Sequence, residues 1–179
     1  MIVAIIGESS SGKSSLVNEF VKRNPSFSKV ITYTTRPKRP NEIEGVDYNF
    51  ITDDEFARMT KEGFFLEYIS YRGWHYGTPK IEAYQNSIVV LNPPGARALR
   101  RSFPESALAK LVYLSVDRKS RMIKLLERGD NIDEAYRRNL SDQGQFMGFE
   151  LEADYVIENK NYERNLEDLC KELENFLEV

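Results

Sequence analysis

The sequence predicts an α/β fold in which a parallel central sheet is flanked by helices. Four short apolar runs, rich in β-branched residues, lack the polar alternation of a half-exposed strand, which is typical of strands covered on both faces. These runs span residues 2–6, 88–91, 111–116 and 155–157. Segments with helical spacing separate them, and this alternation favours a parallel sheet that gathers ligands outside the carboxyl ends of its strands.

The first strand leads directly into a phosphate-binding loop. Residues 7–14 read Gly-Glu-Ser-Ser-Ser-Gly-Lys-Ser, and a helical pattern follows them. Glycines let the backbone turn successive N–H groups inward, the lysine reaches the outer phosphates of a triphosphate, and the hydroxyl after it can ligate Mg²⁺. The positive end of the helix points into the same pocket. The candidate triphosphate-binding residues are Gly7, Ser9, Ser10, Ser11, Gly12, Lys13, Ser14 and Ser15, with Ser14 as the metal ligand.

Composition narrows the class of protein. The 179 residues are 41% hydrophobic, which suffices for one sizeable core, so we expect a single domain over residues 1–179. A net charge of −3 and the lack of a long apolar stretch argue against nucleic-acid and membrane partners. The single cysteine, Cys170, and a core strand that begins directly after Met1 predict a cytoplasmic protein without a leader.

A segment rich in tyrosine and arginine follows the first helix. Residues 32–86 contain short strand-like pieces and predict a small β-rich insertion into the core. We expect its strands near 48–51, 64–69 and 72–76 and its helix near 53–61.

A second segment, residues 128–148, has the pattern of a helical lid. It begins with a turn and N-cap at 128–131 and continues as a polar helix that Gly144 and Gly148 interrupt. An ordinary solvated helix has the same pattern. The core then comprises residues 1–31, 87–127 and 149–179 and ends in a helix over about 162–178, whose apolar face buries Cys170.

Basic and aromatic residues of the insertion suggest a second phosphate site. Arg36 and Arg39 lie three residues apart, and Pro37 and Pro40 keep their segment out of a regular helix. Guanidinium forks suit a phosphate held by several hydrogen bonds. The phenol hydroxyls that could donate to the same phosphate belong to Tyr48 and Tyr76.

At this point the sequence resembles the guanylate kinases, from its first strand to its last helix. The motifs that carry the resemblance are residues 7–14, Thr34-Thr35-Arg36 with Arg39 and Glu42, residues 45–50, Phe65-Leu66-Glu67, Tyr76-Gly77-Thr78 and Arg128-Gly129. The resemblance implies a P-loop kinase in which residues 32–86 form a GMP-binding insertion. It also implies that Arg36, Arg39, Tyr48 and Tyr76 hold the phosphate of GMP, while Thr32, Glu67 and Thr78 face its base.

The chain departs from the family pattern at the end of the 88–91 strand. The family usually has two acidic residues there, spaced by one, whereas this chain has Val90 and Asn92. Asn92 can still form hydrogen bonds to GMP but carries no charge. In the lid, Arg128 matches a family arginine, and Asn139 replaces another beside Arg138.

The leading hypothesis is Mg²⁺-dependent transfer of the γ-phosphoryl group of ATP to GMP or dGMP. The acceptor oxygen is already ionised, so catalysis needs positioning and charge neutralisation and no general base. The candidate catalytic residues are Lys13, Arg36, Arg39, Arg128 and Arg138. Two alternatives stay open: a kinase for another nucleoside monophosphate or a ribose bisphosphate, and a non-catalytic binding module. We expect a monomer or a homodimer.

Other residues that could carry chemistry have simpler explanations. We expect the only histidine, His75, to serve packing or the surface, since this reaction needs no proton transfer. The basic run Arg97, Arg100 and Arg101 predicts a solvated helix face.

Overall fold

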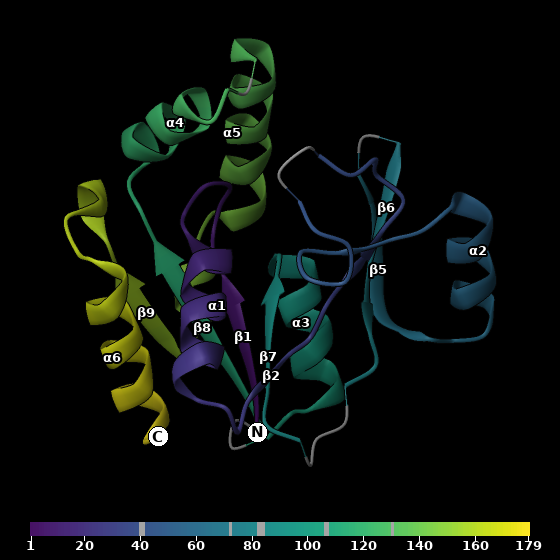
Figure 1. Cartoon of the computed structure of the whole chain (residues 1–179), viewed down its shortest axis with the longest axis horizontal. Coiled ribbons are helices and arrows are strands. Elements are labelled where there is room, and N and C mark those ends of the chain that lie inside the picture. The colour runs from purple at the N-terminus through teal and green to yellow at the C-terminus, as the bar shows by residue number, and fades with distance from the viewer. Residues whose placement is uncertain (40–41, 72, 82–84, 106–107, 130) are drawn as a thin grey trace.

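Five parallel strands form the main sheet of the chain, in the order β2-β7-β1-β8-β9. They span Ile2–Ile6 (β1), Ser28–Lys29 (β2), Ser87–Leu91 (β7), Ala109–Ser115 (β8) and Tyr155–Glu158 (β9). The computed structural model describes residues 1–39, 42–71, 73–81, 85–105, 108–129 and 131–179 (Figure 1). The parallel sheet and its four predicted strands are confirmed; three residues used in the predictions, Pro40, Arg72 and Asp130, lie outside the described residues.

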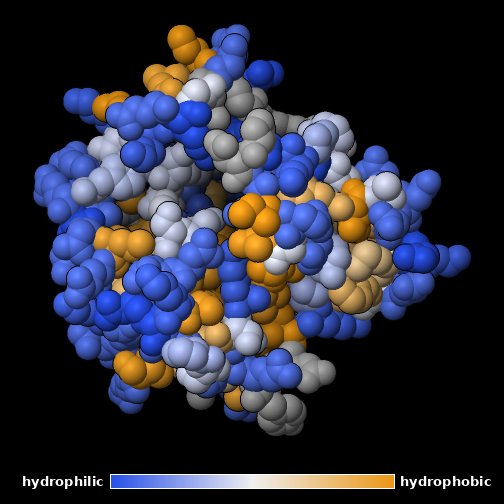
Figure 2. All heavy atoms as spheres, in the orientation of Figure 1, coloured by the Kyte–Doolittle hydropathy of each residue, from blue (hydrophilic) through white to orange (hydrophobic). Residues whose placement is uncertain are grey.

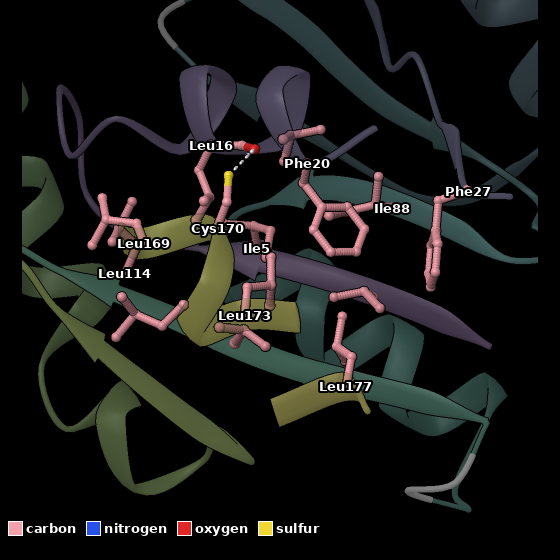
Figure 3. Packing of buried hydrophobic residues seen from close by; sticks show 14 residues of the cluster. Ile5, Leu16, Phe20, Phe27, Ile88, Leu114, Leu169, Cys170, Leu173 and Leu177 are labelled. Atoms are coloured by element: carbon pink, nitrogen blue, oxygen red, sulfur yellow. Dashed lines mark hydrogen bonds between the residues drawn. The ribbon is translucent and has the colours of Figure 1, made fainter. Parts of the chain in front are cut away.

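Helices cover both faces of this sheet. On one face pack α1 (Lys13–Arg23) and α6 (Leu166–Leu177), whose leucines meet the strand side chains as Figure 3 shows. On the other face packs α3 (Pro93–Ser102), together with Phe146 and Phe149. All five residues of β1 are fully buried, because helices cover both faces of the strand. This explains why residues 2–6 form a continuous apolar run.

Cys170 lies inside the first of these layers. Its side chain is fully buried, and its Sγ lies 4.0 Å from the carbonyl oxygen of Leu16 (Figure 3). Burial raises the pKa of the thiol to about 11. The expectation of an inert, buried cysteine is therefore confirmed.

A second sheet, in the order β4-β3-β6-β5, stands beside the first (Figure 1). Its strands span Tyr33–Thr34 (β3), Asn49–Phe50 (β4), Phe65–Tyr71 (β5) and Trp74–Pro79 (β6), and α2 spans Asp53–Lys61. All five elements lie within residues 32–86, consistent with the predicted insertion. The helix begins where expected because Thr52 and Glu55 form a capping box. His75 stacks on Phe56 with ring centroids 5.1 Å apart, which confirms its packing role.

Two packed helices, α4 (Arg118–Glu127) and α5 (Ile132–Phe146), project above the carboxyl ends of the main strands (Figure 1). Asn131 caps α5 through its side chain, in agreement with the predicted start. The prediction of an interruption at Gly144 is wrong, since α5 continues through this residue and ends just before Gly148, which adopts a left-handed conformation. Asn139 is buried and accepts a hydrogen bond from Arg118, so it faces α4.

The last helix begins later than the expected residue 162. Asn161 and Tyr162 both have positive φ angles, which an α-helix cannot accommodate, and Asn165 caps α6 instead. The basic run faces solvent as expected, since Arg97 and Arg101 are exposed and Arg100 is half-buried, but two of its residues are paired. Arg97 forms a two-pronged ion pair with Glu152, and Arg100 pairs with Asp154, because both acidic residues fold back against α3.

Polar and charged side chains cover most of the face shown in Figure 2. This agrees with a chain in which 30% of the residues are charged. Within the described ranges, no helix combines the length and the apolar character needed to cross a bilayer.

Candidate active site

A cavity of about 460 Å³ lies where the main sheet, the insertion and α5 meet. Parallel strands end at this edge of the sheet, so loops from distant parts of the sequence converge on it. Twelve of the predicted site residues line the cavity: Gly7, Ser9, Lys13, Thr32, Arg36, Arg39, Tyr48, Glu67, Tyr76, Thr78, Asn92 and Arg138. The structure thus brings together most residues that the sequence predicts for both nucleotides.

The phosphate loop wraps the carboxyl end of β1. Gly7 passes so close to β8 that a Cβ would lie 2.6 Å from the carbonyl oxygen of Leu114, and Gly12 has a φ of +94°. Both positions therefore require glycine. The remaining predicted serines of the loop do not line the cavity: Ser10 has a positive φ, Ser11 is buried, and Ser14 and Ser15 are exposed in the first turn of α1.

Lys13 sits inside the loop and donates a 2.7 Å hydrogen bond from Nζ to the carbonyl oxygen of Glu8. Burial lowers the pKa of Lys13 to about 8, against the nearby charges of Asp142 and Glu8, which raise it. A lysine so poorly solvated gains much from an incoming phosphate, because the anion replaces the lost water.

Arg36 is held in place by Glu42. Its guanidinium donates two hydrogen bonds of 2.8 and 2.9 Å to the carboxylate and lies over the ring of Tyr48, 5.5 Å from the centroid. Burial opposes the charge of Glu42, but the hydrogen bonds from Arg36 and from the backbone N–H of Arg39 outweigh it and lower the pKa of Glu42. The arginine is thereby fixed before any ligand arrives.

Three guanidiniums, those of Arg36, Arg39 and Arg138, line the cavity, and that of Arg128 lies nearby. Burial lowers the pKa of Arg39, and the positive charges of Arg138, Arg36 and Arg128 lower it further, against the opposing charge of Glu42. Arg128 ends α4 and does not line the cavity, although it lies close enough to act on Arg39. Such a concentration of positive charge suits a polyanionic ligand.

Two tyrosines complete this side of the cavity. The rings of Tyr48 and Tyr76 meet edge to face, with centroids 6.3 Å apart. Burial raises the pKa of Tyr48, which keeps its hydroxyl protonated and able to donate a hydrogen bond.

Glu67 supplies a carboxylate to the same cavity. Thr78 donates a 2.6 Å hydrogen bond to Oε1, whereas the buried Oε2 has no hydrogen-bond partner among the described residues. Burial raises the pKa of Glu67, against the hydrogen bond from Thr78. A buried carboxylate oxygen without a partner costs free energy, so this atom indicates a ligand with N–H donors.

Asn92 stands beside Glu67 at the start of α3. Its Oδ1 accepts a 2.8 Å hydrogen bond from the backbone N–H of Gly95 and so caps the helix. This bond leaves the side-chain amide of Asn92 as the group that can face a ligand.

Three charged residues around the phosphate loop were missed at the sequence level: Glu8, Arg121 and Asp142. They form ion pairs, with Arg121 3.2 Å from Glu8 and 3.8 Å from Asp142. One signal existed for Arg121, since it lies four residues before the buried Leu125 and thus on the inner face of α4. No comparable signal marked Asp142 in its polar helix.

Comparisons with known proteins agree with this geometry. A family model described as guanylate kinase matches residues 1–179. The chain is 34% identical to a guanylate kinase of Coxiella burnetii, over 92% of this chain and 82% of that protein. It is 33% identical to a guanylate kinase of Synechococcus sp., over 94% of this chain and 79% of that protein. The fold resembles a crystal structure of guanylate kinase from Anaplasma phagocytophilum, with a TM-score of 0.73, 22% identity and coverage of 99% and 84%.

Proposed function

We propose, from the premise that this chain belongs to the guanylate kinase family, that it transfers the γ-phosphoryl group of ATP to GMP or dGMP. The products are ADP and GDP or dGDP. The observation that carries the proposal is the buried Oε2 of Glu67, which has no partner among the described residues and shares a cavity with Arg36 and Arg39. Guanine offers N1–H and N2–H₂ donors to such a carboxylate, and its phosphate would take the guanidiniums.

The residues around the cavity divide the chemistry among them. The N–H groups of the phosphate loop and the Lys13 ammonium would bind the donor phosphates. Arg36 and Arg39 would orient the phosphate of GMP, with the hydroxyls of Tyr48 and Tyr76 as further donors. Arg138, and Arg128 from the end of α4, would stabilise the charge of the transferring group.

Mg²⁺ is the cofactor that we propose for this reaction. The hydroxyl of Ser14 is exposed in the first turn of α1, directly after Lys13, and a hard oxygen ligand suits Mg²⁺. Ser14 would hold the ion together with phosphate oxygens of ATP and water. When bound, the ion would neutralise charge on the donor phosphates.

We also place the reaction in the cytoplasm, whose reducing conditions suit the single, buried Cys170.

The two alternatives find less support. A base-free acceptor such as a ribose bisphosphate would leave Glu67 without a function. A binding module has no need of Lys13, which this chain retains in a half-buried position within the phosphate loop.

The first experiment is an assay of ADP release from ATP and Mg²⁺ with GMP, dGMP, AMP, UMP, dTMP or ribose 1,5-bisphosphate as acceptor. Turnover confined to GMP and dGMP is the expected result. Preference for another acceptor would contradict the proposed substrate, and bound ATP without turnover on any acceptor would favour a binding module.

The low pKa of Lys13 predicts proton uptake when ATP binds at pH 8 to 9. Near pH 8 the protein has lost about half of the Lys13 protons, and the donor phosphates favour the charged form. Calorimetric titrations in two buffers with different ionisation enthalpies measure the uptake. A Lys13→Ala protein serves as the control and should show none; equal heats in both buffers with the native chain would contradict the shift.

The lowered pKa of Lys13 also predicts how the free energy of unfolding changes with pH. Between pH 8 and 10.5 the unfolded chain keeps the Lys13 proton while the folded chain has released it. The unfolded state then binds more protons, so this group makes the free energy of unfolding rise with pH across that window.

Gly95→Ala is predicted to raise the KM for GMP about fivefold without loss of stability. A Cβ at this position would lie 3.1 Å from Oε1 of Glu67 and 3.2 Å from Oδ1 of Asn92, so both side chains must shift by a few tenths of an ångström. Alanine favours a helix over glycine by up to about 1 kcal/mol, so the melting temperature should hold or rise. An unchanged KM would show that the position of Glu67 is not critical.

A further inference from the structure

A carboxylate of α5 contacts the backbone of the phosphate loop. The N–H of Ser9 donates a 2.7 Å hydrogen bond to Oδ2 of Asp142, which lies 133 residues later in the chain. Inward N–H groups of such loops bind phosphate oxygens. The carboxylate oxygen thus takes a hydrogen bond of the kind that the loop offers to an anion.

The same carboxylate oxygen faces a buried arginine. Arg121 is only 5% exposed, and its Nη1 lies 3.8 Å from Oδ2 of Asp142. Within the part of the chain that the structure describes, this Nη1 has no hydrogen-bond partner, so its N–H donors are not used. Together, Ser9 and Arg121 form a compact anion site, and the Asp142 carboxylate occupies it.

The rest of Arg121 is fixed from behind. Its Nε donates a 3.0 Å hydrogen bond to the carbonyl oxygen of Val116, and its Nη2 donates a 3.2 Å hydrogen bond to Glu8. The other oxygen of Glu8 accepts a 2.8 Å hydrogen bond from the hydroxyl of Tyr113. Glu8 therefore helps to fix the position of Arg121, whereas Asp142 faces Nη1, the nitrogen of Arg121 whose N–H donors are not used.

The charges make Asp142 the exchangeable member. Lys13 and Arg121 carry two positive charges, which Glu8 and Asp142 balance. A nucleoside triphosphate brings several negative charges to the same loop. In a poorly solvated site, an adjacent carboxylate would repel its phosphates. Glu8 is held by Arg121 and by the hydroxyl of Tyr113 from β8, whereas Asp142 lies on α5, which packs against α4 above the sheet.

We propose that Asp142 occupies a phosphate-oxygen position of the donor site, and that Arg121 is a further phosphate-binding residue that exchanges Asp142 for an outer phosphate of ATP. The identification of ATP as the donor rests on the proposed function. Asp142 and Arg138 lie four residues apart and so share one face of α5.

The test measures equilibrium binding by calorimetry, with ATP and Mg²⁺ and without any acceptor. Asp142→Asn keeps the shape of the side chain and removes its charge, so ATP should bind about tenfold more tightly, as one charge-assisted hydrogen bond no longer competes. Adenosine, which has no phosphate, should bind equally to both proteins. Asp133→Asn removes an exposed carboxylate from the same helix and should leave ATP affinity unchanged.

A double-variant cycle tests the part of Arg121. Arg121→Lys should weaken ATP binding, and the gain from Asp142→Asn should largely vanish in the double variant, because both changes act on one anion site. Because Arg121 is buried, thermal unfolding must first show that the Arg121→Lys protein is folded. If this variant does not fold, the Asp142 variants alone test the proposal. Asp142→Ala should reproduce the gain of Asp142→Asn.

ATP affinity that is unchanged or weaker in both Asp142 variants would overturn the proposal, and weaker binding would assign the carboxylate to the ATP-bound state. Failure of the proposed function would look different. ATP would then bind with the predicted changes in affinity, while GMP would elicit no release of ADP.

Discussion

Lys13→Ala is expected to reduce kcat for phosphoryl transfer by roughly a thousandfold. The half-buried ammonium lies within the loop, where its charge acts at close range and with reduced screening by water. Charge that builds up on the donor phosphates during transfer would lose its nearest counterion. ADP release at saturating ATP and GMP measures the loss.

The matched control for this change is Lys22→Ala. Lys22 lies on the same helix, its side chain is 78% exposed, and it pairs only loosely with Glu19. Its loss should leave turnover unchanged. Native-like turnover by Lys13→Ala would contradict the assignment of the loop to the donor, provided that both variants unfold at similar temperatures.

Glu67→Gln is expected to lower kcat/KM for GMP about a hundredfold. Two hydrogen bonds from guanine to one carboxylate are charge-assisted, and glutamine can accept only one while its amide meets the second N–H of the base. Thr78 can still donate to the amide oxygen, so the fold around residue 67 should persist. The melting temperature should not fall, since the burial that raises the pKa of Glu67 no longer opposes a charge.

Turnover of AMP provides the internal reference for this variant. Adenine has no pair of N–H donors that matches the carboxylate of Glu67, so AMP turnover should change far less than GMP turnover. The preference of the enzyme for GMP over AMP should therefore decrease. Glu62→Gln, which alters an exposed carboxylate at the end of α2, is the control. Unchanged GMP turnover in Glu67→Gln would remove Glu67 from the base site.

Local signals explain which parts of the fold were predictable. The strand at residues 2–6 is an uninterrupted apolar run, and α2 begins where Thr52 and Glu55 make a capping box with groups three residues apart. Where the local signal was weak, the observed start of a helix differs from the predicted one. The last helix begins only at Leu166, because the residues before it adopt left-handed conformations that no nearby proline or glycine announced.

The residue types of the candidate site could be predicted from the sequence alone. The residue types that can hold phosphates and guanine follow from short motifs, and most of them line one cavity. Which charged groups pair with one another could be seen only in the folded chain. Arg97 meets Glu152 across 55 residues, and Asp142 meets the N–H of Ser9 across 133. Such contacts depend on how separate elements pack, and packing of distant elements leaves no periodic or local trace in the chain.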